Sequence, residues 1–107
     1  MTMPLSIAFQ DLEPSEFVEQ RIREEAEKLS QFEAHITKCH VVVAQPHRHS
    51  NKGNAWHVRI DVDVPHAPPI IVNREPGVDH AHDDVYVAIR DAFKAARRQL
   101  QDRHERG

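Results

Sequence analysis

Four basic side chains near the end of the chain could bind phosphate groups. They are Arg90, Lys94, Arg97 and Arg98. On a helix, which turns by about 100° per residue, they share about a quarter of the circumference, roughly 130° from the centre of the apolar stripe of the same segment. Basic side chains that neutralise phosphates release counterions and so favour nucleic-acid binding. The pattern predicts a phosphate-binding face, and an ordinary solvated helix face is the alternative.

The stretch from residue 46 to residue 54 is a second basic segment. It contains Arg48, Lys52, His47 and His49 and no acidic residue. Its proline, serine, asparagine and glycine residues are typical of a loop, and loops held by a rigid scaffold often carry binding residues. Arg48 and Lys52 are therefore further candidates for RNA or phosphate contact. The alternative is a hydrophilic connection between two strands.

Two histidine pairs resemble halves of a metal site. His47 and His49, like His80 and His82, are separated by one residue, which places both side chains of a pair on one side of an extended segment. Zinc requires three or four ligands with hydrogen-bonded support around them. Nothing in the sequence brings the two pairs together, so we expect loop histidines and no bound metal. Metal binding or metal-dependent catalysis by these histidines is kept as an alternative.

The sequence lacks the familiar signatures of catalysis. It contains no G-x-S-x-G run, no Walker phosphate-binding loop and no dinucleotide-binding fingerprint, and it has only three glycines. Cys39 is the single cysteine and lies in an apolar stretch, which favours a small buried side chain over a reactive thiol. These observations predict a protein that is not an enzyme and needs no cofactor.

Hydrophobic periodicity predicts the elements that position these residues. Alternation of apolar side chains indicates strands at residues 5–9, 36–45, 55–64 and 70–73. A helix is expected to begin after Ser15, which can cap it. Its apolar stripe consists of Val18, Ile22, Ala26, Leu29 and Phe32. A last helix is expected from Asp83 or Asp84 to about His104. Its stripe consists of Val85, Ile89, Ala92, Phe93, Ala96 and Leu100.

The order β-α-β-β-β-α predicts an α+β fold with a four-stranded sheet whose last three strands are antiparallel. The strand at residues 55–64 has one apolar and one polar side. Because only one face of the sheet is apolar, both helices are expected to pack on that face. A chain of 107 residues is the size of one domain, so residues 1–107 are expected to form a single unit.

Composition and charge narrow the possible partners. With 39% hydrophobic and 29% charged residues, the chain is typical of globular proteins and not of membrane proteins, and no signal peptide is recognisable. We therefore expect a cytoplasmic protein. Its formal charge is −3, but the charge is unevenly distributed. The segment Glu13–Glu33 has seven acidic and three basic residues, whereas Arg90–Gly107 has six basic and three acidic residues. We expect a polyanionic partner to contact the basic segments of the chain.

The last helix resembles that of the ribosome hibernation-promoting factors, also called sigma-54 modulation proteins or ribosome-associated translation inhibitors. The runs Asp84-Val85-Tyr86-Val87-Ala88-Ile89 and Arg98-Gln99-Leu100 are similar to the D-x-Y-x-A-I and R-Q-L runs of that family. The Lys28-Leu29 region, the order of elements and the length also agree with its short form. One difference is Ala95, where the family has a lysine, and in this chain the basic charge has moved to Arg97.

This resemblance implies a factor that binds ribosomal RNA in the decoding channel of the small ribosomal subunit and stops translation under stress or in stationary phase. It also implies that basic residues of the last helix make the RNA contacts, which here are Arg90, Lys94, Arg97 and Arg98. A second RNA-binding alternative is a module that recognises double-stranded RNA by its shape, because antiparallel sheets with helices serve that purpose too.

Overall fold

The computed structural model describes residues 4–45, 56–74 and 84–106. Their elements follow the predicted order β-α-β-β-β-α. The elements are β1 (Leu5–Gln10), α1 (Glu16–Phe32), β2 (Lys38–Ala44), β3 (His57–Asp63), β4 (Ile70–Arg74) and α2 (Val85–Arg106). Each lies within a few residues of its expected range.

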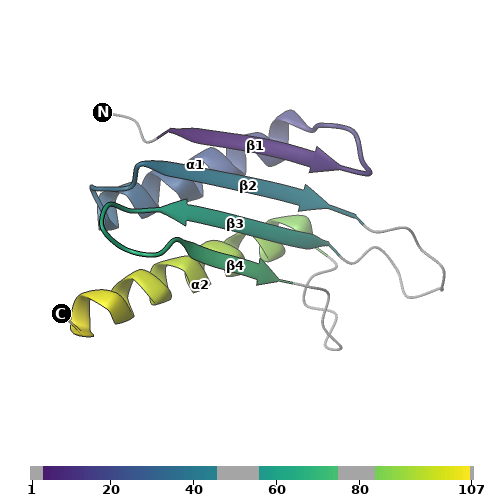
Figure 1. The fold of residues 1–107 in the computed structure, drawn as a ribbon. Coiled ribbons are helices and arrows are strands. Elements are labelled where there is room, and N and C mark those ends of the chain that lie inside the picture. The colour runs from purple at the N-terminus through teal and green to yellow at the C-terminus, as the bar shows by residue number, and fades with distance from the viewer. Residues whose placement is uncertain (1–3, 46–55, 75–83, 107) are drawn as a thin grey trace.

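The four strands form one mixed sheet in the order β1-β2-β3-β4 (Figure 1). The pairs β2–β3 and β3–β4 are antiparallel, as predicted. β1 pairs with β2 in parallel, with Leu5 opposite Cys39 and Phe9 opposite Val43. Parallel neighbours require a crossover connection, and α1 supplies it. One side of the sheet is therefore a β-α-β unit formed by β1, α1 and β2. The other side is an antiparallel meander of β2, β3 and β4.

Both helices cover the same face of the sheet, which confirms the predicted packing (Figure 1). Alternation in β3 explains this arrangement, because Val58, Ile60 and Val62 are fully buried whereas Arg59 on the opposite face is exposed. The helical part of the core consists of Val18, Ile22, Ala26 and Leu29 of α1 and Ala88, Ile89, Ala92, Phe93, Ala96 and Leu100 of α2.

Capping side chains fix where each helix begins. Ser15 is in an extended conformation, and its Oγ accepts a hydrogen bond from the Val18 amide at 3.4 Å. At the start of α2, the Asp84 carboxylate accepts a hydrogen bond from the Tyr86 amide at 2.8 Å. A carboxylate in this place also opposes the positive end of the helix dipole. Each cap satisfies an amide that has no partner within its helix.

The end of the α1 stripe departs from the prediction. Phe32 was expected in the core but is 38% exposed. It is the last residue of α1, and its ring packs beneath the guanidinium of Arg97 from α2. Helical periodicity gives the direction of a side chain but not whether the sheet extends far enough to cover it, so the last turn of a stripe is where this prediction fails.

Cys39 is buried in the sheet, as predicted. Burial raises the pKa of its thiol to about 12, and the negative charge of Asp61 adds to this effect. Because the thiolate is the nucleophilic form, this side chain stays protonated and unreactive at neutral pH.

Candidate nucleic-acid interface

The side of α2 that faces away from the sheet carries the predicted basic residues. Arg90, Lys94, Arg97 and Arg98 are all exposed. Their outward direction follows from the packing of the helix, because Ala88, Ile89, Ala92, Phe93 and Ala96 occupy the opposite side and are buried in the core. The sequence pattern therefore predicted correctly that these four side chains are exposed and lie away from the core.

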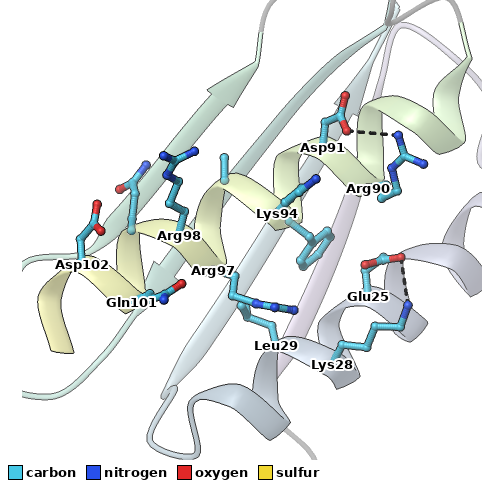
Figure 2. A pocket seen from close by; sticks show the side chains of 13 residues that line it. Glu25, Lys28, Leu29, Arg90, Asp91, Lys94, Arg97, Arg98, Gln101 and Asp102 are labelled. Carbon is cyan, nitrogen blue, oxygen red and sulfur yellow. Dashed lines mark ion pairs between the residues drawn. The ribbon is translucent and has the colours of Figure 1, made fainter. Parts of the chain in front are cut away.

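A shallow groove lies beside these residues, between α2 and α1 (Figure 2). It is lined by Glu25, Lys28 and Leu29 of α1 and by residues of α2 between Arg90 and Asp102, including all four predicted cations. We call it the interhelix groove. Within it, Arg97 is directed toward α1, whereas Arg98 extends to the other side of α2 (Figure 2). The four cations therefore flank the groove on α2 and do not point at one spot.

Lys28 is a groove residue that the charge pattern of α2 could not reveal. It comes from α1 and lines the same groove as Arg90 and Lys94. The only signal in the sequence was the similarity of the Lys28-Leu29 region to the hibernation factors. Its position depends on how the two helices pack, which local periodicity does not specify.

The cations of the groove differ in how they are paired. The Lys28 ammonium lies 3.6 Å from a Glu25 carboxylate oxygen, and the Arg90 guanidinium lies 3.6 Å from Asp91. Among the described residues, no carboxylate lies within ion-pair distance of Lys94, Arg97 or Arg98. Surface ion pairs are weak and exchange readily. The unpaired charge of these three residues is therefore available to an anionic ligand.

Two cation–π contacts join α1 to α2, one near each end of the helix pair. The Arg97 guanidinium lies 5.7 Å from the centroid of the Phe32 ring, and that of Arg21 lies 5.1 Å from the centroid of the Tyr86 ring. Both distances lie within the range of a cation–π interaction. In each contact the arginine and the aromatic ring come from different helices, so the contacts help to fix how α1 and α2 pack together.

The second predicted binding segment lies outside the described residues. Arg48 and Lys52 belong to it, as do His47 and His49, and the pair His80 and His82 is likewise outside. Within the described ranges, no three histidine, cysteine or carboxylate side chains are grouped so that they could hold a metal ion.

Exposed guanidinium and ammonium groups along a groove can bind a chain of phosphates, because each donates hydrogen bonds and contributes positive charge. A family model described as sigma 54 modulation protein / S30EA ribosomal protein matches residues 5–107. The chain belongs to this family. The resemblance noted in the last helix is thereby confirmed over nearly the whole sequence.

Solved structures share the fold at low sequence identity. The N-terminal domain of Protein Y from Thermus thermophilus aligns with a TM-score of 0.69 and 17% identity, covering 94% of this chain and 98% of that one. A ribosomal subunit interface protein from Coxiella burnetii aligns with a TM-score of 0.72 and 17% identity, covering 96% and 99%. The search of curated proteins gives no match. These structures show that the β-α-β-β-β-α arrangement is the fold of both proteins.

Membership identifies the chain as a ribosome-associated factor of the S30EA type. The family is not one of enzymes, which agrees with the lack of catalytic signatures in the sequence. In the described part of the chain, no helix combines the length and apolar character needed to cross a membrane.

Proposed function

We propose that this chain binds ribosomal RNA in the decoding channel of the small ribosomal subunit and so inhibits translation under stress or in stationary phase. The observation that carries the proposal is the row of unpaired cations on α2, Lys94, Arg97 and Arg98, in a member of the S30EA family. Phosphates are the most abundant anions on a ribosomal surface, and a row of unpaired cations suits them.

The distribution of charge supports a defined orientation on the RNA. The net charge of −3 repels a polyanion at long range, and five of the seventeen acidic residues lie on α1. Glu16, Glu24 and Glu27 are exposed there. Because α1 and α2 lie side by side on one face of the sheet, we propose that the RNA contacts the α2 side of the groove. There Lys94, Arg97 and Arg98 have no carboxylate within ion-pair distance among the described residues.

The segment with Arg48 and Lys52 is a second proposed contact. It connects β2 to β3, at the end of the sheet where Ala44 and His57 pair. In this proposal residues 1–107 act as one ribosome-binding unit in the cytoplasm, with no metal or cofactor. The similar structure from Coxiella burnetii is that of a ribosomal subunit interface protein, which agrees with a role at the ribosome.

Sedimentation tests the proposal. Purified protein without a histidine tag is mixed with small subunits, with intact ribosomes or with a bare RNA duplex, and each mixture is centrifuged through a density gradient at low and at high salt. We expect migration with small subunits and ribosomes at low salt and release at high salt, since phosphate contacts weaken as salt rises. Absence from both fractions at low salt would refute the proposal. Equal retention on the bare duplex would indicate a general module for double-stranded RNA.

A second measurement addresses inhibition itself. Added protein should lower the yield of a cell-free translation reaction and should compete with messenger RNA for small subunits. Binding to ribosomes without either effect would place the site outside the decoding channel.

A further inference from the structure

Phe32 is an aromatic side chain in an unusual place. Its ring is 38% exposed at the end of a helix whose other stripe residues are buried. Part of this large ring is therefore open to solvent. A contact of defined geometry joins it to Arg97, whose guanidinium carbon lies 5.7 Å from the ring centroid.

Arg97 connects this ring to the interhelix groove. The same side chain that lies over Phe32 also lines the groove, beside Lys94 and Arg98. In Figure 2 it reaches from α2 toward α1. A guanidinium held over an aromatic ring loses much of its rotational freedom. Arg97 therefore presents a planar cation over the ring, at the edge of a basic surface.

Proteins that bind unpaired nucleic acid combine cationic side chains with planar groups on which bases can stack. Single-stranded RNA is bound by basic grooves that follow its backbone together with aromatic rings or arginine planes on which bases stack. A duplex keeps its bases stacked on each other and offers mainly phosphates and ribose hydroxyls to a protein. Lysines and arginines alone would suit either form of RNA, whereas an exposed aromatic–arginine pair favours the unpaired form.

From these contacts we infer that Phe32 and Arg97 together form a stacking site for an unpaired nucleobase, so that the interhelix groove binds single-stranded ribosomal RNA. This inference rests on the proposed function, since it specifies the form of RNA that the same groove takes. The base stacks against the exposed part of the pair, and the flanking Lys94 and Arg98 bind the adjoining phosphates.

The pair also has a simpler possible role, which is to fasten α1 to α2. A fastening role would make substitutions at Phe32 change stability but not the preference for bases over bare backbone. The experiment therefore measures that preference directly. The probes are an end-labelled single-stranded RNA of twelve nucleotides, the same strand with abasic sites at its centre, and a duplex of the same length.

The substitutions are Phe32→Leu, which keeps apolar bulk but removes the flat ring, and Phe32→Trp, which keeps the flat ring. Phe17→Leu is the matched control, because Phe17 is 78% exposed on the same helix and lies fifteen residues, or about 22 Å, from Phe32. Thermal unfolding is measured for each variant so that binding is compared between folded proteins.

Wild-type protein should bind the intact strand at least about fivefold more tightly than the abasic strand, since one stacked base contributes that much or more. Phe32→Leu should abolish this preference and leave affinity for the abasic strand unchanged, whereas Phe32→Trp and Phe17→Leu should retain it. On ribosomes, Phe32→Leu should bind at least about fivefold more weakly, and Phe32→Trp should bind like wild type.

Wild-type affinity of Phe32→Leu for ribosomes would overturn the inference, as would equal affinity of the wild-type protein for intact and abasic strands or tighter binding to the duplex. In each of these cases salt-sensitive ribosome binding by the wild-type protein would leave the proposed function standing. Failure of the wild-type protein to bind ribosomes at all would refute both the stacking site and the proposed function.

Discussion

Helices α1 and α2 share one core but differ in the charge that they present to solvent. α1 carries five acidic and three basic side chains, and each of its bases, Arg21, Arg23 and Lys28, lies within 3.6 Å of a carboxylate of the same helix. α2 carries six basic and three acidic side chains. Its Lys94 and Arg98 have no such partner among the described residues.

We propose that the pairing of these charges matters as well as their number. A base that already has a carboxylate one turn away gives up that weak contact when it binds a phosphate. An unpaired base has nothing to lose except hydration. On this comparison we propose that the unpaired bases of α2 make the ligand contacts and that the paired bases of α1 remain solvated.

The largest expected effect concerns the hydrophobic core that α1 and α2 share. Ile60 is fully buried in β3 beneath both of them. Ile60→Ala should lower the free energy of unfolding by about 2–5 kcal/mol through lost transfer energy and an unfilled cavity. Thermal unfolding followed by circular dichroism should show one transition at a lower temperature. An unchanged melting temperature, or separate melting of the two helices, would contradict the common core.

The next effect tests the difference between the helices. The double variant Arg97→Glu and Arg98→Glu should weaken ribosome binding on the order of 100-fold, because two charge-assisted contacts are lost. Both side chains are exposed, so the protein should still fold.

The control for this charge reversal lies on α1. The double variant Glu19→Lys and Glu27→Lys should bind ribosomes as tightly as wild type or slightly more tightly. A folded Arg97→Glu, Arg98→Glu protein that inhibits translation at the wild-type concentration would assign binding to the segment with Arg48 and Lys52 instead.

Replacing the caps should produce a smaller effect and a graded one. Ser15→Ala and Asp84→Ala should each lower the free energy of unfolding by about 1 kcal/mol. Asp84→Ala should cost more, since its carboxylate makes the shorter hydrogen bond, at 2.8 Å against 3.4 Å, and also opposes the helix dipole. Urea denaturation measures both. A larger loss for Ser15→Ala would contradict this comparison of the two helix starts.

The last prediction concerns the ionisation of Cys39, which changes stability only at alkaline pH. Its pKa rises from 9.0 to about 12 in the folded protein. A raised folded-state pKa stabilises the protein fully below pH 9, and this contribution is lost as the pH rises toward 12. Wild type should therefore lose more stability than Cys39→Ala between these pH values. Iodoacetamide at pH 8 should modify the thiol only after unfolding in urea, and rapid modification of the native protein would contradict its burial.

Much of the fold could be predicted from local patterns. Alternation in β3 and the stripes of both helices were enough to give the order of elements, the shared sheet face and the burial of Cys39. Two features of the fold could not be predicted from local sequence patterns. The parallel pairing of β1 with β2 joins residues 34 positions apart, and no local pattern encodes it. The exposure of Phe32 depends on which part of α1 the sheet and α2 cover.

The candidate site was predicted in part, for a related reason. The face of α2 follows from helical geometry, so Arg90, Lys94, Arg97 and Arg98 could be grouped by their spacing in the sequence. Lys28 joins the groove only because the helices pack side by side. The contact of Arg97 with Phe32 depends on the same packing, and this is why a residue assigned to the core lies partly exposed against α2.

The slope of ribosome affinity against salt concentration tests the central claim most directly, which is that unpaired bases of α2 contact phosphates and paired bases of α1 do not. The slope is measured for wild type, Lys94→Gln, Arg98→Gln and, as the matched control, Arg23→Gln, whose guanidinium pairs with Glu19 at 3.2 Å. Each α2 variant should flatten the slope of log affinity against log salt by about 0.7 to 0.9, and Arg23→Gln should leave it unchanged. Identical slopes for wild type and both α2 variants, or an equal flattening by Arg23→Gln, would contradict the claim.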